Sequence, residues 1–246
     1  MSLPYLGQTR STSQPTHLLH APDTFVRTKL PGMDKAVGIV HVSPAVGARF
    51  AQYTAEFEPD GNLGSTPNQR FVYVTEGELT VELAGEKHHL AKDGYVYIPQ
   101  GLWHRISAVG AAKSEVIEKP YGASAGFPLP EAFIGSEPAI VSTPLMGDES
   151  LRVKALMPAS ESYDFAVNTM LYYPGAALAM VEVHIMEHGL MMLEGGGIYK
   201  LAESWYPVTE GDFIWMAAYC PQWFGALGKT PAKYLIYKDW NRGPFL

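Results

Sequence analysis

Several things are scarce in this sequence, and each scarcity narrows the possible functions. There is a single cysteine, Cys220, so no disulfide can form within the chain, as is typical of a reducing cytoplasm. Charged residues make up only 17%, and the net charge of -7 comes without a basic cluster, which argues against a nucleic-acid partner. No apolar run approaches the roughly 20 residues that span a bilayer. The N-terminus also lacks the layout of a secretory signal. We therefore expect a cytoplasmic protein with neither nucleic-acid nor membrane partners.

What the sequence does contain is a series of short strand-like segments. Apolar residues make up 47% of the chain, and 24 Gly and 19 Pro interrupt them. Segments such as F-V-Y-V-T-E-G, E-L-T-V-E-L-A-G-E-K and G-Y-V-Y-I-P-Q-G follow one another at intervals of about ten residues, as in a β-sandwich or small barrel. With 246 residues, the chain can form one large all-β domain or two small ones.

The pattern occurs twice, which indicates an internal duplication. Gly77 and Gly195 are 118 positions apart, as are His104 and Gln222, and matching strand and turn types accompany this offset. We predict an all-β protein of two tandem barrels. The predicted parts are an N-terminal arm or cover strands (1–35), a first barrel (36–120), a linker rich in Gly, Pro, Ser and Ala (121–150) and a second barrel (151–246).

The second half carries the most distinctive residues. Residues 181–197 read V-E-V-H-I-M-E-H-G-L-M-M-L-E-G-G-G. If 181–188 form an extended strand, Glu182, His184 and His188 share one face, and Glu187 faces outward. A carboxylate and two imidazoles on one buried face are unfavourable unless something pairs them. A divalent metal ion is the partner that suits all three.

A helical interpretation of the same stretch leads to a different class of enzyme. Residues 184–188 match H-x-x-E-H, the motif of inverted zinc peptidases, and residues 177–194 tolerate a helix by propensity. Both halves are otherwise rich in strands, and the first half has no helical counterpart. These surroundings favour the strand and disfavour the peptidase.

Two groups of residues in this sequence also resemble the sequence motifs of the cupin family. Residues 94–104, G-Y-V-Y-I-P-Q-G-L-W-H, look like the second cupin motif, and residues 211–222 fit the same frame with Gln222 in place of its histidine. The first cupin motif maps onto Glu182, His184, His188 and Gly195. The resemblance therefore implies two tandem jelly-roll barrels, a bicupin, with a Glu182, His184, His188 and Gln222 metal set in the second.

The first barrel departs from the cupin pattern. The positions where its ligands should be are taken by Arg70, Thr66 and Ser65, which leaves His104 alone. We expect this barrel to lack a metal and to serve as scaffold or interface, with a structural role for His104.

Within the cupins, the second half resembles the bicupin (S)-ureidoglycine aminohydrolases. The resemblance rests on E-V-H-I-M-E-H-G, G-G-G-I-Y-K-L, G-D-F-I-W-M and Y-K-D-W-N-R. It implies a manganese enzyme that releases ammonia from ureidoglycine to give (S)-ureidoglycolate in the breakdown of purines and allantoin. It also implies substrate contacts by Tyr199, Tyr234 and Lys238, with Glu182 and Lys238 as catalytic residues. Independently, a mixed N/O ligand set favours Mn²⁺ or Fe²⁺ over a structural zinc site, although another divalent metal remains open.

Two other kinds of function compete with this one. A manganese or iron bicupin could act on another small acid, as oxalate decarboxylases and dioxygenases do, but these usually keep three histidines. A non-catalytic bicupin could store or sense a ligand, but such proteins often lack ligands in both barrels. We expect an enzyme with a small-molecule substrate, and a homo-oligomer because cupin sandwiches often join through sheet edges and N-terminal arms.

Overall fold

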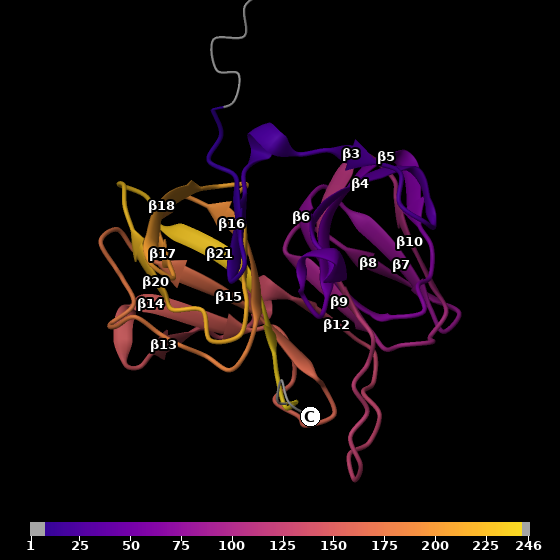
Figure 1. Cartoon of the computed structure of the whole chain (residues 1–246). Helices are drawn as coiled ribbons and strands as arrows, with labels where there is room; N and C mark the ends of the chain where they lie inside the picture. Colours follow the sequence, from indigo (N-terminus) through magenta and orange to yellow (C-terminus); the bar gives the residue numbers. More distant parts are fainter. Residues whose placement is uncertain (1–7, 243–246) are drawn as a thin grey trace, which may run out of the picture.

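The computed structural model describes residues 8–242. It consists of antiparallel strands and three short 3-10 helices, η1 (Pro22–Thr24), η2 (Pro44–Val46) and η3 (Glu137–Ala139). Among these residues, no helix is long and apolar enough to cross a membrane. Figure 1 shows two strand-rich bodies side by side, the N-terminal half in purple and magenta and the C-terminal half in orange and yellow. The prediction of an all-β fold is confirmed.

The N-terminal half contains one curved sheet of ten strands, ordered β12-β9-β6-β11-β5-β10-β7-β8, with β3 and β4 attached beside β5. Its strands are β3 (Arg27–Thr28), β4 (Met33–Val42), β5 (Ala51–Leu63), β6 (Gln69–Glu76), β7 (Leu79–Leu83), β8 (Glu86–Leu90), β9 (Gly94–Ile98), β10 (His104–Ala108), β11 (Ala112–Lys119) and β12 (Phe133–Ser136).

The C-terminal half contains an eight-stranded sheet, β1-β2-β19-β16-β21-β15-β14-β13, and a three-stranded sheet, β18-β17-β20. Its strands are β1 (Thr12–Gln14), β2 (His17–His20), β13 (Thr143–Leu145), β14 (Asp148–Ala155), β15 (Phe165–Tyr172), β16 (His188–Glu194), β17 (Gly196–Leu201), β18 (Ser204–Thr209), β19 (Phe213–Met216), β20 (Gln222–Ala226) and β21 (Ala232–Asp239).

The N-terminal strands belong to the C-terminal half. Strand β2 pairs with β19 in register from His17 opposite Met216 to His20 opposite Phe213. The chain then crosses to β3, as the indigo trace in Figure 1 shows. Residues 8–35, the described part of the predicted arm, thus include cover strands of the second barrel. The predicted linker contains β12, η3 and β13, and β12 pairs with β9 of the N-terminal half.

The core explains why the central strands are apolar on both faces. In β16, Leu190 and Met192 point into the interior of the C-terminal half, whereas Met191 points into a second cluster shared by the two halves. Strand β6 alternates in the same way, with Val72 inside the N-terminal half and Phe71 in the shared cluster. Because both faces are buried, these strands appear in the sequence as continuous apolar runs rather than alternating ones.

The two halves repeat each other at particular backbone positions. Gly77 and Gly195 both have a positive φ, 70° and 65°. A Cβ on either would lie 2.5 or 2.4 Å from a backbone carbonyl oxygen of the facing strand, so only glycine fits both turns. His104 and Gln222 each begin a strand, β10 and β20. These equivalences support the duplication inferred from the sequence.

Candidate metal and substrate site

The predicted ligands lie at one end of the C-terminal half. Glu182 and Gln222 face each other through two backbone hydrogen bonds, Glu182 N to Gln222 O at 2.8 Å and Gln222 N to Glu182 O at 2.9 Å. Nε2 of His184 is 3.1 Å from Oε2 of Glu182, and the His184 and His188 rings are 5.3 Å apart. The structure thus brings the four predicted ligands together.

The local backbone differs from the prediction of one continuous strand. Glu182 forms an isolated bridge, residues 185–186 bend, and the strand β16 begins only at His188. Up to residue 186 the expected alternation is present, since Val181, Val183 and Ile185 are exposed and the residues between them are half-buried.

The prediction that Glu187 faces outward is wrong. Its carboxylate is buried and accepts hydrogen bonds from the backbone N of Arg49 at 3.0 Å and from Nε1 of Trp215 at 3.2 Å. That face of the segment packs against the N-terminal half instead of water. Burial and the neighbouring Asp239 raise the pKa of Glu187, and its hydrogen bonds oppose this shift.

His188 has the properties of a metal ligand. It is buried, and its Nδ1 has no hydrogen-bond partner. Burial, assisted by the charges of His184 and Lys238, lowers the pKa of His188 to about 3. The imidazole is therefore neutral at physiological pH, which is the form that binds metals. A cation would satisfy this otherwise unpaired nitrogen.

The contacts among these four residues are pairwise and do not gather the side chains around one point. In the part of the chain that the structure describes, no group of three or more His, Cys, Asp or Glu side chains forms a site ready to hold a metal ion. Glu182 and His184 instead contact each other, and the fourth candidate, Gln222, contributes an amide. The chemistry of the donors fits a divalent ion, which would compete for the Glu182–His184 contact.

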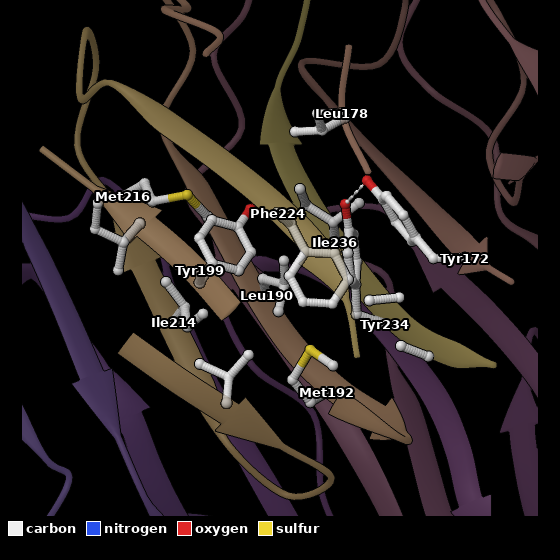
Figure 2. Close-up of a cluster of buried hydrophobic side chains, with 14 of the residues drawn as sticks. Tyr172, Leu178, Leu190, Met192, Tyr199, Ile214, Met216, Phe224, Tyr234 and Ile236 are labelled. Carbon is white, nitrogen blue, oxygen red and sulfur yellow. Dashed lines mark hydrogen bonds between the residues drawn. The ribbon is translucent and has the colours of Figure 1, made fainter. Parts of the chain in front are cut away.

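The predicted substrate contacts surround these ligands. Strand pairing sets Lys238 opposite His188 across β21 and β16. The hydroxyl of Tyr199 donates to Oε1 of Gln222 at 3.3 Å. The hydroxyl of Tyr234 is 2.7 Å from that of Tyr172 on β15, and Figure 2 shows these two phenols meeting at one end of the apolar cluster.

Burial shifts the pKa values of the proposed substrate contacts and of Tyr172. Burial raises the pKa values of Tyr199, Tyr234 and Tyr172, so all three remain neutral hydrogen-bond donors. Burial lowers the pKa of Lys238, and the Glu182 carboxylate opposes this shift. Tyr172 was not predicted from the sequence, because an aromatic residue on a barrel strand gives no signal that its hydroxyl meets a site residue.

The two largest of the described cavities do not coincide with the predicted ligands. A small cavity of about 80 Å³ is bordered by Glu182. Two larger ones, about 470 and 480 Å³, share Glu194 and Lys233 in their walls and contain none of the predicted site residues. We assign the site from its chemistry, because the larger cavities are lined by ion pairs that are already satisfied, such as Lys233 with Glu137 at 2.6 Å.

In the N-terminal half, the corresponding position is filled from within the chain. NH1 of Arg70 donates to Nε2 of His104 at 2.7 Å, and NH2 of Arg70 donates to Glu118 at 2.8 Å. The other nitrogen of His104, Nδ1, is 2.8 Å from the Leu102 carbonyl oxygen, so that nitrogen carries the proton. Burial tends to raise the pKa of Glu118, but Arg70 and neighbouring hydroxyls outweigh it and the net shift is downward. The cluster is fully paired, as a structural role for His104 requires.

Comparison with known proteins identifies the class. Residues 54–118 match the family model described as a cupin domain. The oxalate decarboxylase of Bacillus subtilis, a protein with Mn(II) centres, shares the fold at 11% identity with a TM-score of 0.70, covering 96% of this chain and 80% of that one. The fold and the matched model define a cupin-type protein.

More similar proteins narrow the assignment. The (S)-ureidoglycine aminohydrolase of Arabidopsis thaliana is 38% identical over 243 residues, which is 97% of this chain and 80% of that protein. A crystal structure of the putative glyoxylate-induced protein of Pseudomonas aeruginosa aligns with a TM-score of 0.89 at 30% identity, covering 99% of this chain and 95% of the other. The chain belongs to the (S)-ureidoglycine aminohydrolase family.

Proposed function

We propose that the protein is a divalent-metal-dependent (S)-ureidoglycine aminohydrolase that converts ureidoglycine and water to (S)-ureidoglycolate and ammonia. The observation that carries this proposal is the juxtaposition of Glu182, His184, His188 and Gln222 in a chain of this family. The three residues proposed for the substrate, Tyr199, Tyr234 and Lys238, border the same end of the barrel.

Each residue has a task in this reaction. Glu182, His184, His188 and Gln222 would hold Mn²⁺ or Fe²⁺, and the bound ion would supply a Lewis acid to which donor groups of the substrate could bind. Lys238 neutralises the substrate carboxylate, and the Tyr199 and Tyr234 phenols donate hydrogen bonds that fix its orientation. The C–N bond to the amine breaks, and a water oxygen bonds to the same carbon. Glu182 accepts the proton that the water releases and passes it to the departing nitrogen.

The decisive experiment measures ammonia release from ureidoglycine by the full-length protein as purified, after chelation, and after Mn²⁺ is restored. We expect activity to be lost with the metal and recovered with Mn²⁺, and the ureidoglycolate to be the S enantiomer. Unchanged ammonia release by metal-free protein would contradict the metal dependence. No release in any metal state would contradict the function itself.

The alternatives can be tested in the same series. Oxalate as substrate distinguishes an acid-decomposing bicupin, and the absence of turnover with either substrate indicates a binding protein. The match to oxalate decarboxylase at 11% identity shows the fold alone and does not favour that activity. The cytoplasmic location and the homo-oligomer remain predictions, and light scattering after gel filtration measures the number of subunits.

A further inference from the structure

The segment just before β5, in the N-terminal half, contacts Glu187, the residue that precedes His188. The backbone N of Arg49 donates to both carboxylate oxygens of Glu187, at 3.0 and 3.2 Å, and its side-chain Nε donates at 3.2 Å. The same guanidinium pairs with Asp239 at the end of β21. Glu187 is therefore held by several hydrogen bonds from the other half of the molecule.

The residue that follows His188 is held by the same segment. A Cβ on Gly189 would lie 2.6 Å from both the Phe50 ring and the side-chain oxygen of Gln52. The Phe50 ring in turn stacks on Tyr237 with ring centroids 3.9 Å apart. Residues of the 49–52 segment thus contact the Glu187 side chain on one side of His188 and the Gly189 backbone on the other.

His188 differs from two of the other proposed ligands in which half of the molecule holds its neighbouring residues. Glu182 and Gln222 are tied to each other by backbone hydrogen bonds within the C-terminal half. His188 begins its strand immediately after a bend, and the groups that fix its neighbours include residues 49–52 of the N-terminal half.

We propose that Arg49 is a positioning residue for the metal site, and that the N-terminal half, through the Arg49–Glu187 contact and the packing of Phe50 and Gln52 on Gly189, orients His188 toward the metal. This inference rests on the proposed metal site. Under this proposal the N-terminal half, which has no ligand set of its own, contributes to metal binding. Groups that orient metal ligands typically change metal affinity by about 10- to 100-fold when removed.

The test compares Arg49→Met with Arg27→Met in the full-length protein. Arg27 is a matched control because it also forms a two-bond pair with a carboxylate, Glu56, at 2.6 and 3.0 Å, in the same half. We expect Arg49→Met to bind Mn²⁺ about tenfold more weakly, measured by calorimetry, and to gain less melting temperature when Mn²⁺ is added. Arg27→Met should match the wild type in both measurements.

Turnover provides a readout that a merely structural role would not move. With Arg49→Met, excess Mn²⁺ should restore most of kcat, because the defect lies in metal affinity. An Arg49→Lys variant keeps the charge with fewer donors, and we expect intermediate affinity. If Arg49→Met does not fold, Arg49→Lys decides the question, since wild-type affinity in that variant overturns the inference.

The remaining outcomes are distinct. Affinity within about twofold of the wild type in Arg49→Met, or an equal loss in Arg27→Met, overturns the positioning role and leaves the proposed function intact. A wild-type protein that neither binds Mn²⁺ nor releases ammonia overturns both.

Discussion

At the scale of single residues, the chemistry of the site follows from where each group is buried. The sequence nominated Glu182, His184 and His188 as metal ligands because they are close together along the chain, and Gln222 because of its offset from His104; their role as ligands stays a prediction. It did not predict the burial of Glu187, since the surface that covers this residue comes from a segment about 140 positions away. Nothing near Glu187 in the sequence records that contact.

Lys238 provides a first prediction at this scale. Replacing Lys238 by Met removes the cation proposed to pair with the substrate carboxylate, and a charged hydrogen bond contributes about 1.5–3 kcal/mol. We expect KM to rise by about 10- to 100-fold with a smaller change in kcat. Steady-state kinetics on ureidoglycine measures this, with the exposed Lys229→Met as control. An unchanged KM in Lys238→Met would remove this residue from the site.

Glu115 provides a second prediction, about stability. Its carboxyl is fully buried between Thr54 and Gln52, and burial raises its pKa above the usual value of 4.5. The folded protein therefore retains a proton that the unfolded chain releases, so this group destabilises the fold progressively as pH rises from about 4.5 through the folded-state pKa.

Glu115→Gln should abolish this pH dependence. The new amide can donate to the side-chain oxygen of Gln52, which has no partner at present, if the Gln52 amide turns over. We expect the variant to be more stable than the wild type by about 1 kcal/mol at pH 7–8 and equal to it at pH 4. Urea unfolding at both pH values measures the difference, and an equal gain at both would contradict the titration.

At the scale of elements, the positions of strands delimited by Gly and Pro could be predicted from the sequence. Which strands pair with one another could not. Segments such as 94–98 and 213–216 are short apolar runs beside turn residues, and both are strands. The pairing of β2 with β19 is different, because it joins residues about 200 positions apart and leaves no local pattern. The bend at 185–186 was also missed, since its residues suit an extended strand.

The turn between β16 and β17 provides a prediction for an element. Gly195 has a φ of 65°, and a Cβ there would lie 2.4 Å from the Pro231 oxygen. Gly85 has a φ of 85° with nothing within 4 Å of its missing Cβ. Gly195→Ala should destabilise by about 3 kcal/mol and Gly85→Ala by about 1 kcal/mol. Thermal unfolding of both variants measures the difference in stability. Equal losses of stability would contradict a close approach at Gly195.

At the scale of the whole molecule, the N-terminal segment ties the two halves together. Strand β2 completes the eight-stranded sheet beside β19, and Arg10 pairs with the buried Asp212. A chain lacking residues 1–20 would leave the β19 edge open and Asp212 without its cation. Open edges promote pairing between chains.

We expect this truncated chain to melt at a lower temperature and to aggregate at concentrations where the full chain does not. Calorimetry together with light scattering measures both properties. The single substitution Arg10→Met, which keeps β1 and β2, should lie between the truncated and full chains. A truncation that melts like the full chain would show that these strands contribute little.

The Arg70 cluster of the N-terminal half has one more consequence for the whole molecule. Its guanidinium pairs with Glu118 and His104. The positive charge at this position therefore belongs to the chain itself, and no ion from solution is needed there. A chelator such as EDTA should therefore leave the Arg70 cluster unchanged. Any structural change caused by removing the proposed metal should therefore be confined to the C-terminal half.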